Sequence, residues 1–266
     1  MADTLSLAGK VALITGSGRT GGIGAAIART FAKNGASVII HYASNSSKES
    51  ALKISASIEA DFKVKSTVVC GRVDQQETAR DIVAQALADL KTPHIDILIN
   101  NAGGAGHKPL LETTADDFTG IFGANVFGAT YLTQAVVTVG KMPKGGRIIN
   151  VGTAASRMQL DSYAVYAAAK AAQDALTSAW AGELGFTHGI TVNTLAPGAF
   201  VTDLTRELWI KEDGTSSEMA QCIIARTKAE PRLGELQDMA DAALLLVSEK
   251  SRWITAQWIA VSGGTY

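Results

Sequence analysis

The sequence predicts an α/β fold in which about seven parallel strands form a doubly wound sheet with helices on both faces. Three observations support this class: short runs rich in Val and Ile recur along the chain, helical stretches fill nearly every gap between the runs, and no linker rich in Pro, Gly or Ser interrupts the alternation. Strands that alternate with helices are parallel and joined by right-handed crossovers. We therefore expect one domain over residues 1–266.

The expected strands are nearly continuous in their apolar residues, as is typical of strands buried on both faces. They lie at 11–15, 37–41, 65–69, 95–99, 147–151, 190–194 and 257–261. The helices expected between them include 24–34, 77–90, 115 to about 142, 163–184 and 238–248.

One stretch, 198–231, breaks this rhythm between the sixth strand and the last helix. Ligands of such sheets bind outside the carboxyl ends of the strands, so an insertion there is well placed to be a substrate lid. The alternative is a surface excursion that carries a short helix.

Composition narrows the partners that we expect. Hydrophobic residues make up 47% of the chain and charged residues 18%, which is enough to build a buried core. A formal net charge of -1 provides no basic field for nucleic acid or an anionic membrane, and no apolar run is long enough to span a bilayer. Residues 1–4 lack the pattern of a secretory signal, which favours a cytoplasmic location. Cys70 and Cys222 form neither a disulfide framework nor a metal-binding pattern.

A glycine-rich turn follows the first expected strand and predicts a dinucleotide site. Glycines permit a tight turn and let backbone amides approach a pyrophosphate, which the positive N-terminus of the next helix stabilises. The alternative is a glycine-rich turn without a ligand. The candidate cofactor contacts in this turn are Gly16, Gly18, Arg19, Gly22, Ile23 and Gly24.

The end of the second strand favours NADPH over NADH. An NAD-selective site usually has Asp or Glu there to bind the ribose 2′-hydroxyl, but no carboxylate occurs before Glu49. Hydroxyl, amide and cationic groups take its place, and Arg19 can reach the same position; a 2′-phosphate binds such groups and is repelled by a carboxylate. The alternative is that the serines of 44–47 cap the next helix. The candidate contacts are Tyr42, Ala43, Ser44 and Asn45.

Two later strand ends add weaker cofactor candidates. Asp74, after the third strand, can accept a hydrogen bond from the adenine amino group. The fourth strand ends in small and amide residues that can pass close to the cofactor, namely Asn101, Ala102 and Gly103.

Tyr166 and Lys170 are the candidate chemical pair, because residues four apart project from one face of a helix. A phenol has a pKa of about 10, too high for efficient proton exchange at neutral pH, and an adjacent ammonium lowers it. Thr153, just after the fifth strand, can donate to a substrate oxygen, and Asn125 can hold a water that feeds protons to Lys170. The alternative is an amphipathic surface helix, but the alanines around Tyr166 indicate close packing, where an unpaired lysine is costly.

The order of these motifs resembles the short-chain dehydrogenase/reductase family over almost the whole chain. That family has a Thr-Gly-rich first turn, Asn-Asn-Ala-Gly after the fourth strand, an Asn in the next helix, a Ser after the fifth strand, Tyr-x-x-x-Lys thirteen residues on, and Pro-Gly after the sixth strand. The corresponding positions here are 15–24, 100–103, Asn125, Thr153, Tyr166 with Lys170, and Pro197 with Gly198. Within the family the chain is most similar to the fungal NADPH-dependent hydroxynaphthalene reductases and related ketoreductases, given 42–46 and Arg19.

The resemblance implies a Rossmann fold and a role for each site residue. Tyr166 would donate the proton, Lys170 would bind the nicotinamide ribose and lower the pKa of Tyr166, and Asn125 would support the proton relay. The adenosine ribose would lie beside 101–103 and the nicotinamide over Val151. The carboxamide end would meet Pro197, Gly198 and Thr202. Family members are commonly tetramers, so we expect a homo-oligomer, a tetramer or a dimer.

Three positions depart from the family pattern. Five residues separate Gly16 from Gly22 where the family usually has three, which leaves open the glycines that touch phosphate. Thr153 keeps the hydroxyl of the usual Ser and adds a methyl group that restricts its rotamer. Ser262 stands where an Asp commonly precedes the terminal Gly-Gly.

The expected reaction is hydride transfer between nicotinamide C4 and a ketone or alcohol carbon of a small molecule. Mixed apolar and aromatic residues near the site favour a bulky, partly cyclic substrate of secondary-metabolite type; they are Gly104, Met158, Tyr163, Phe200 and Trp209, together with 105–107. The alternative is a non-redox NADP(H)-binding protein or scaffold, because a fold does not guarantee a chemistry. Enoyl reduction is disfavoured, since that group tends to place its Lys further from the Tyr.

Overall fold

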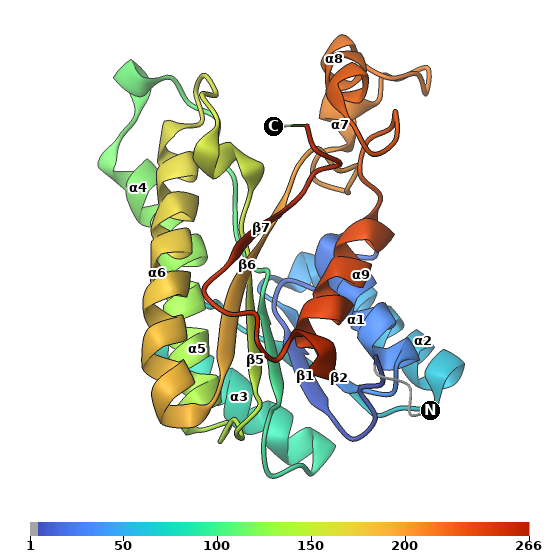
Figure 1. Ribbon diagram of the computed structural model, residues 1–266, viewed down its shortest axis with the longest axis vertical. Coiled ribbons are helices and arrows are strands. Elements are labelled where there is room, and N and C mark those ends of the chain that lie inside the picture. Colours follow the sequence, from blue (N-terminus) through green and yellow to red (C-terminus); the bar gives the residue numbers. More distant parts are fainter. Residues whose placement is uncertain (1–4, 266) are drawn as a thin grey trace.

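The computed structural model describes residues 5–265 and confirms the α/β class. Seven parallel strands form one sheet in the order β3-β2-β1-β4-β5-β6-β7 (Figure 1). The strands are β1 (Val11–Ile14), β2 (Ser37–Tyr42), β3 (Ser66–Cys70), β4 (Ile97–Asn100), β5 (Arg147–Val151), β6 (Thr191–Pro197) and β7 (Trp258–Val261). The strand order reverses between β1 and β4, and ligands of open α/β sheets bind outside the carboxyl ends at such a point.

Helices cover both faces of the sheet. One face carries α1 (Ile23–Lys33), α2 (Lys48–Phe62) and α9 (Leu236–Val247), and the other carries α3 (Gln76–Leu90), α5 (Gly128–Thr138) and α6 (Ala164–His188) (Figure 1). α4 (Ala115–Phe122) packs beside α6, while α7 (Arg206–Trp209) and α8 (Glu218–Arg226) lie above the sheet. The short 3-10 turns are η1 (Asn45–Ser47), η2 (Leu110–Glu112), η4 (Ala154–Arg157) and η5 (Glu249–Ser251).

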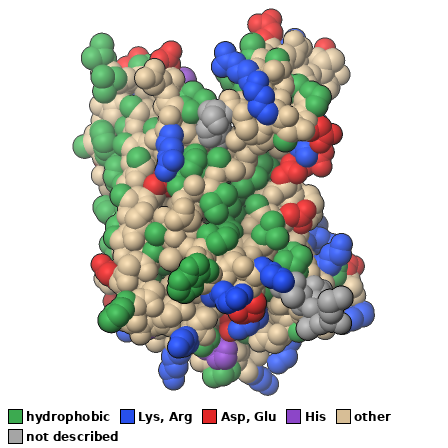
Figure 2. Space-filling model, in the orientation of Figure 1, with side chains coloured by type: hydrophobic (Ala, Val, Ile, Leu, Met, Phe, Trp, Pro, Cys, Tyr) green, Lys and Arg blue, Asp and Glu red, His purple; other side chains and the backbone are tan. Residues whose placement is uncertain are grey.

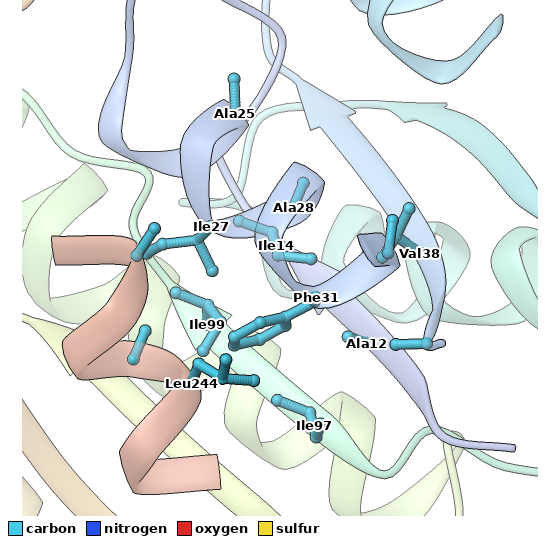
Figure 3. Packing of buried hydrophobic residues seen from close by; sticks show 14 of the residues in the cluster. Ala12, Ile14, Ala25, Ile27, Ala28, Phe31, Val38, Ile97, Ile99 and Leu244 are labelled. Carbon is cyan, nitrogen blue, oxygen red and sulfur yellow. The ribbon is translucent and has the colours of Figure 1, made fainter. Parts of the chain in front are cut away.

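Successive strand residues divide the core into two layers. In β1, Ile14 packs with the cluster of α1 and α9, whereas Leu13 packs with that of α3 and α5. Figure 3 shows Phe31 of α1 in the first layer, close to Ile99 of β4 and Leu244 of α9. Complete burial of a side chain of this size stabilises the fold by about 2–3 kcal/mol. Burial on both faces explains why the strands are continuous rather than alternating in their apolar residues.

The structure corrects one expected helix and moves several strand ends. The stretch 115–142 is not one helix, because a π-helical segment, η3 (Gly123–Phe127), separates α4 from α5. β4 begins two residues later than expected and β6 continues to Pro197 rather than ending at 194. The expected lid, 198–231, contains the two helices α7 and α8 and therefore has more local structure than a plain loop.

The carboxyl ends of the strands open between two lobes. Segment 104–112 with α4 forms one lobe, and α7 with α8 forms the other (Figure 1). Figure 2 shows the surface hollowed between these lobes. Within residues 5–265, no helix is both long and apolar enough to cross a membrane, and no group of His, Cys, Asp and Glu side chains could hold a metal ion.

Candidate active site

The glycine-rich turn after β1 is anchored at its foot by His41 of β2. The backbone amide of Gly16 donates to His41 Nδ1 at 3.0 Å, and His41 Nε2 lies 2.9 Å from the carbonyl of Gly71. Burial lowers the pKa of His41 to about 4, so at neutral pH the ring is neutral, with its proton on Nε2 and a free acceptor at Nδ1. Gly16 has φ +63°, in the left-handed region that favours glycine. Sequence reasoning placed Gly16 in the site but missed the histidine that holds it.

Asn101 holds the same turn from the end of β4. Its side-chain amide donates to Thr15 O at 2.8 Å and to Gly16 O at 3.1 Å. The neighbouring Asn100 turns to the opposite face of the sheet, where Nδ2 donates to Asn150 Oδ1 at 2.9 Å. The paired amides of 100–101 therefore support the sheet edge. A contact of the Ala102 and Gly103 backbone with the cofactor stays a proposal.

The tip of the glycine-rich turn lies against the end of β2 and the start of α2. A Cβ on Gly18 would lie 2.9 Å from Tyr42 Cβ, and Thr20 Oγ1 lies 3.3 Å from Ser50 Oγ. The two neighbours of Arg19 in sequence thus lie against Tyr42 and Ser50. Ser44 Oγ and Ser46 Oγ lie 2.7 Å apart.

Two further observations concern the serines and the carboxylate of this region. Ser47 is the N-cap residue of α2, but its side chain makes no capping hydrogen bond with any residue in the described part of the chain. Glu49 Oε1 is paired with Lys53 Nζ at 2.6 Å, which lowers the pKa of Glu49. The hydroxyls of 44–47 are thus not consumed by capping, and the nearest carboxylate is already neutralised by a lysine.

The first residues of the lid are joined to the glycine-rich turn. Gly21 N donates to Asp203 Oδ2 at 3.0 Å, and Asp203 N donates to Gly21 O at 2.9 Å. A Cβ on Gly21 would overlap the Asp203 carboxylate, so only glycine fits here without displacing it. We call this pair of residues the lid clasp. It shows what the lengthened turn does: the turn reaches the lid, which the spacing of its glycines alone did not reveal.

Asp74, predicted to meet the adenine, already has a partner. Arg72 binds both carboxylate oxygens, with Nε 3.0 Å from Oδ1 and Nη2 2.6 Å from Oδ2. This pairing lowers the pKa of Asp74 and keeps it ionised. An adenine contact by Asp74 would therefore be shared with Arg72.

Lys170 is buried at the inner end of the candidate site. Its Nζ donates to the carbonyl oxygen of Val151 at 2.7 Å and to Gln173 Oε1 at 3.2 Å. A Cβ on Gly103 would lie 3.7 Å from Nζ, which places the ammonium beside the end of β4. Complete burial lowers the pKa of Lys170 to about 8, and Asp174 acts in the opposite direction.

Tyr166 lies one helical turn before Lys170, and the Thr153 side chain acts on its hydroxyl. Burial raises the pKa of Tyr166, the hydrogen bond with the Thr153 side chain lowers it, and the electrostatic effect of Tyr163 raises it. Burial prevails, so the phenol stays protonated in the free chain. The sequence-based expectation of a pKa lowered by the ammonium is therefore not met in the chain without ligands. Lys170 directs its proton donors to Val151 and Gln173 instead.

The π-helical segment η3 places the Asn125 side chain next to Gly103 and Lys170. Asn125 Nδ2 donates to Ile121 O and to Gly104 O, each at 2.8 Å. Its Oδ1 is buried and has no partner among the atoms of residues 5–265. A Cβ on Gly103 would meet this oxygen and, at 3.7 Å, Lys170 Nζ. The unpaired Oδ1 and the ammonium thus border one small polar space, which suits a bridging water.

Aromatic side chains form one wall beside Tyr166. The rings of Tyr163 and Tyr166 have centroids 6.5 Å apart, and His107 packs edge-on against Tyr163 at 5.1 Å. Lys108 N donates to Ser162 O at 2.7 Å, which fixes the segment after β4 against this wall. Met158 is exposed on the same side of the chain, just before these residues in sequence, and Gly104 is exposed as well.

The two remaining substrate candidates lie apart from this wall. Phe200 is buried in the core cluster of α1 and α9 and lines a cavity of about 300 Å³ behind the lid, whose lining includes neither Tyr166 nor Lys170. Trp209 ends α7, half-buried, and its Nε1 has no partner within the described range. Thr202 Oγ1 is bonded to Thr205 Oγ1 at 2.9 Å at the start of the lid. Phe200 thus packs in the core and the aromatic wall comes from residues before β6, while substrate contacts by Phe200 and Trp209 stay predictions.

The residues present fit a nicotinamide dinucleotide. A Cβ on Gly16 would lie 2.9 Å from Ala102 Cα, so the floor of the turn is stripped of side chains where a pyrophosphate would need the backbone. The end of β2 offers hydroxyls and a nearby cation, as a 2′-phosphate requires. At the other end, the buried oxygen of Asn125 has no partner within residues 5–265 and lies near the ammonium of Lys170.

Comparison with known proteins agrees with this geometry. A family model described as "Enoyl-(Acyl carrier protein) reductase" matches residues 16–266. The short-chain dehydrogenase/reductase FrzI of Cladobotryum sp is 35% identical, over 97% of this chain and 96% of its own. Among solved structures, a blue fluorescent protein from a metagenomic library in complex with NADPH is 33% identical, with a TM-score of 0.86 over 98% of this chain and 99% of that one. A 7α-hydroxysteroid dehydrogenase complexed with NADH and 7-oxo glycochenodeoxycholic acid is also 33% identical, with a TM-score of 0.88 over 99% of this chain and 97% of that one.

Proposed function

Since this chain belongs to the short-chain dehydrogenase/reductase family, we propose that it is an NADPH-dependent oxidoreductase that interconverts a ketone and an alcohol. One observation carries the proposal: Tyr166, with Thr153 acting on its hydroxyl, the buried ammonium of Lys170 and the unpaired Asn125 oxygen lie together at the carboxyl edge of the sheet. The closer likeness to fungal hydroxynaphthalene reductases stays a prediction.

The side chains of the site divide the work of carbonyl reduction among them. NADPH, when bound, supplies the hydride that adds to the carbonyl carbon. The hydroxyls of Thr153 and Tyr166 bind the carbonyl oxygen, and Tyr166 transfers its proton to that oxygen as the alcohol forms. Lys170 then returns a proton to the phenolate, and a water held by Asn125 Oδ1 links Lys170 to solvent. The raised pKa of Tyr166 keeps the phenol protonated at neutral pH before the transfer, and the ammonium of Lys170 offsets it by favouring the phenolate as that forms.

The preference for NADPH is argued from residues at the end of β2. A similar structure holds NADPH and another holds NADH, so membership of the family does not decide the question. In this chain the residues on either side of Arg19 lie against Tyr42 and Ser50, the serine hydroxyls there are free of helix capping, and Glu49 is paired with Lys53. A dianionic 2′-phosphate is favoured by each of these features.

The substrate class follows from the wall beside Tyr166. Tyr163 and His107 present aromatic surface beside Tyr166, and the exposed Met158 lies five residues before Tyr163 in the sequence. Such a wall suits a bulky, partly cyclic ketone or alcohol of secondary-metabolite type. The similar 7α-hydroxysteroid dehydrogenase is complexed with a polycyclic keto acid, which supports a substrate of this size.

The proposed function is tested by removing one oxygen atom from the site. Tyr166→Phe deletes the proton donor and leaves the ring in place, so turnover of a responsive ketone should fall by at least a hundredfold. NADPH binding, followed by nicotinamide fluorescence, should remain within a few-fold of that of the parent chain. Turnover retained by the variant would show that Tyr166 is not the acid. A parent chain that binds NADPH but oxidises it with no member of a broad carbonyl panel would favour a binding module or scaffold instead.

Enoyl reduction is the second candidate, because the matching family model is described by that activity. The four-residue spacing of Tyr166 and Lys170 and the hydroxyl of Thr153 favour a carbonyl substrate over a C=C bond. The panel should therefore contain an enoyl thioester and the corresponding 3-oxoacyl thioester. Faster oxidation of NADPH with the enoyl compound would reverse the order of the two candidates.

We also propose that the chain forms a homo-oligomer. Large apolar side chains lie exposed along the α4 to α5 region, where Leu111 is 97% exposed and Phe118 and Phe127 are about half exposed. Contiguous exposed apolar surface of this kind is typical of subunit contacts. Sedimentation velocity of the parent chain and of Leu111→Lys would test it; a monomeric parent chain would overturn it. A cytoplasmic location stays a prediction.

A further inference from the structure

Gln173 is a buried amide that the reaction as outlined above does not use. It lies on α6 one turn after Lys170 and has no exposed surface. Its Oε1 accepts from Lys170 Nζ at 3.2 Å. The only other acceptor recorded for that ammonium in the described part of the chain is the carbonyl oxygen of Val151, at 2.7 Å.

The orientation of this amide is imposed by the lysine. An ammonium has donors and no acceptor, so Oε1 must face Lys170 and Nε2 must point away. Nε2 is buried, and residues 5–265 provide it with no partner. A buried donor without a partner destabilises the folded chain, and an apolar side chain in its place would not carry that cost. The hydrogen bond from Lys170 to Gln173 Oε1 compensates for this cost.

We propose that Gln173 is a positioning residue, whose side-chain oxygen fixes the Lys170 ammonium beside Val151 and Gly103 and keeps it charged. The inference rests on the proposed function, because it assigns Gln173 a part in the proton supply to Tyr166. Gln173 Oε1 is then a second neutral acceptor for the Lys170 ammonium, beside the carbonyl oxygen of Val151.

None of the charged groups near Lys170 within residues 5–265 forms a hydrogen bond with its ammonium, so Gln173 is the side chain that holds it. On its own helix, Asp174 is the one charged group that acts on it and Tyr166 is the other titratable neighbour. Asp174 is itself half-buried with a raised pKa, and Ser156 Oγ donates to it at 2.8 Å. Arg157, on the turn after β5, acts on Asp174, not on Lys170. Asn125 from η3, Val151 from β5 and Gly103 after β4 are neutral.

Loss of the acceptor should therefore change the charge state of Lys170. With Gln173→Met only the Val151 carbonyl remains, so the pKa of Lys170 falls further below its ordinary value. The alkaline limb of the pH profile for ketone reduction should then move to lower pH by about one unit, the typical worth of a hydrogen bond to a charged group. Gln173→Glu keeps the shape and adds a negative charge, which should move the same limb to higher pH. A purely structural role would not give opposite shifts.

The experiment compares these two variants with a matched control on the same helix. Thr177→Val removes another buried polar group of α6, whose hydroxyl binds Asn150, Thr194 and the backbone carbonyl of Gln173, but neither the Gln173 side chain nor Lys170. This substitution should lower the melting temperature and leave the alkaline limb of the pH profile unchanged. The variants are followed by the pH dependence of kcat with NADPH and a ketone. Lysine side chains carrying ¹³C at Cε give the pKa of Lys170 directly by NMR titration.

The outcomes separate this inference from the proposed function. A parent chain without ketone reductase activity overturns the proposed function, and the NMR titration then still decides whether Gln173 supports the charge of Lys170. If the parent chain is active but neither the alkaline limb nor the pKa of Lys170 moves in either Gln173 variant, only the inference about Gln173 is overturned. Should Gln173→Met not fold, Gln173→Glu supplies the test, and an unmoved or lowered lysine pKa in that variant counts against the proposal.

Discussion

The two sides of the open edge of the sheet are held in different ways. On the side of α6, Lys170 and Thr177 are buried and joined to strand residues by hydrogen bonds that water cannot reach, and buried Gln173 binds Lys170. On the side of the lid, the clasp between Gly21 and Asp203 consists of two hydrogen bonds at the surface. Buried polar contacts are costly to break, whereas exposed ones exchange with water at little cost.

This difference indicates which side can move. Proton transfer depends on side chains held within a few tenths of an ångström, and the buried network under α6 provides that rigidity. The proposed function requires an edge that opens for a dinucleotide and a bulky substrate, and the side of segment 198–231 is held weakly enough to open. The glycine-rich turn belongs to both sides, since its foot is held by buried His41 and its tip by the clasp.

The largest expected effect concerns the foot of the turn. His41 is neutral in the folded chain, with a pKa of about 4 against 6.5 in the unfolded chain. As the pH falls from 6.5 towards 4, the unfolded chain takes up a proton that the folded chain does not, so the free energy of unfolding falls by about 3 kcal/mol. His41→Gln should remove this contribution. Urea unfolding of both chains between pH 7 and 4 measures it, and parallel pH dependences would show that the foot is not rigidly buried.

The next effect concerns the fixed side. Thr153→Ala deletes a donor aimed at the substrate oxygen and should reduce kcat about a hundredfold, or about 2.7 kcal/mol. It also removes the influence of the Thr153 side chain that lowers the pKa of Tyr166, so the pKa of Tyr166 itself should rise. Thr153→Ser is the control, because it keeps the hydroxyl that accepts from Ala155 N at 3.2 Å. Equal kcat values for the Ala and Ser variants would mean that Thr153 only caps the turn.

The sequence predicted the rigid parts of the molecule better than the contacts between distant segments. Continuous apolar runs located all seven strands, and the spacing of Tyr166 and Lys170 located the pair, because these signals are local. The π-helical turn at Asn125 was missed because helical periodicity hardly changes when one residue is inserted. His41, Gln173 and Asp203 were missed for another reason: each acts on a residue that only the fold brings near. A histidine inside an apolar strand and a glutamine among alanines were the available signals.

The third effect lies where the tip of the turn meets β2. Arg19→Ala combined with Ala43→Asp removes the nearby cation and introduces a carboxylate that binds a ribose 2′-hydroxyl and repels a phosphate. The ratio of kcat/KM for NADPH to that for NADH should fall at least tenfold, about 1.4 kcal/mol. Lys63→Ala, a charge change at the opposite end of α2, should leave the ratio unchanged. A ratio that survives the double substitution would move the 2′-phosphate site elsewhere.

The smallest effect concerns the clasp itself. Gly21→Ala places a methyl group where the Asp203 carboxylate lies, and Asp203→Ala removes the acceptor, so each variant should free the start of the lid. An exposed hydrogen bond contributes about 1 kcal/mol, so trypsin cleavage at Arg206 and Lys211 should be about fivefold faster. The double variant should be no faster than either single one, because both substitutions break one contact.

Asp213→Ala separates the clasp from general loosening of the lid. Asp213 accepts from Thr215 N at 2.8 Å within the lid and does not touch the glycine-rich turn. Its loss should leave cleavage at Arg206 unchanged. NADPH should slow cleavage of the parent chain if the turn, once occupied, holds the lid more firmly, and it should slow cleavage of Gly21→Ala much less. Equal protection of both chains by NADPH would mean that the lid closes independently of the clasp, and that both sides of the edge are positioned by the sheet alone.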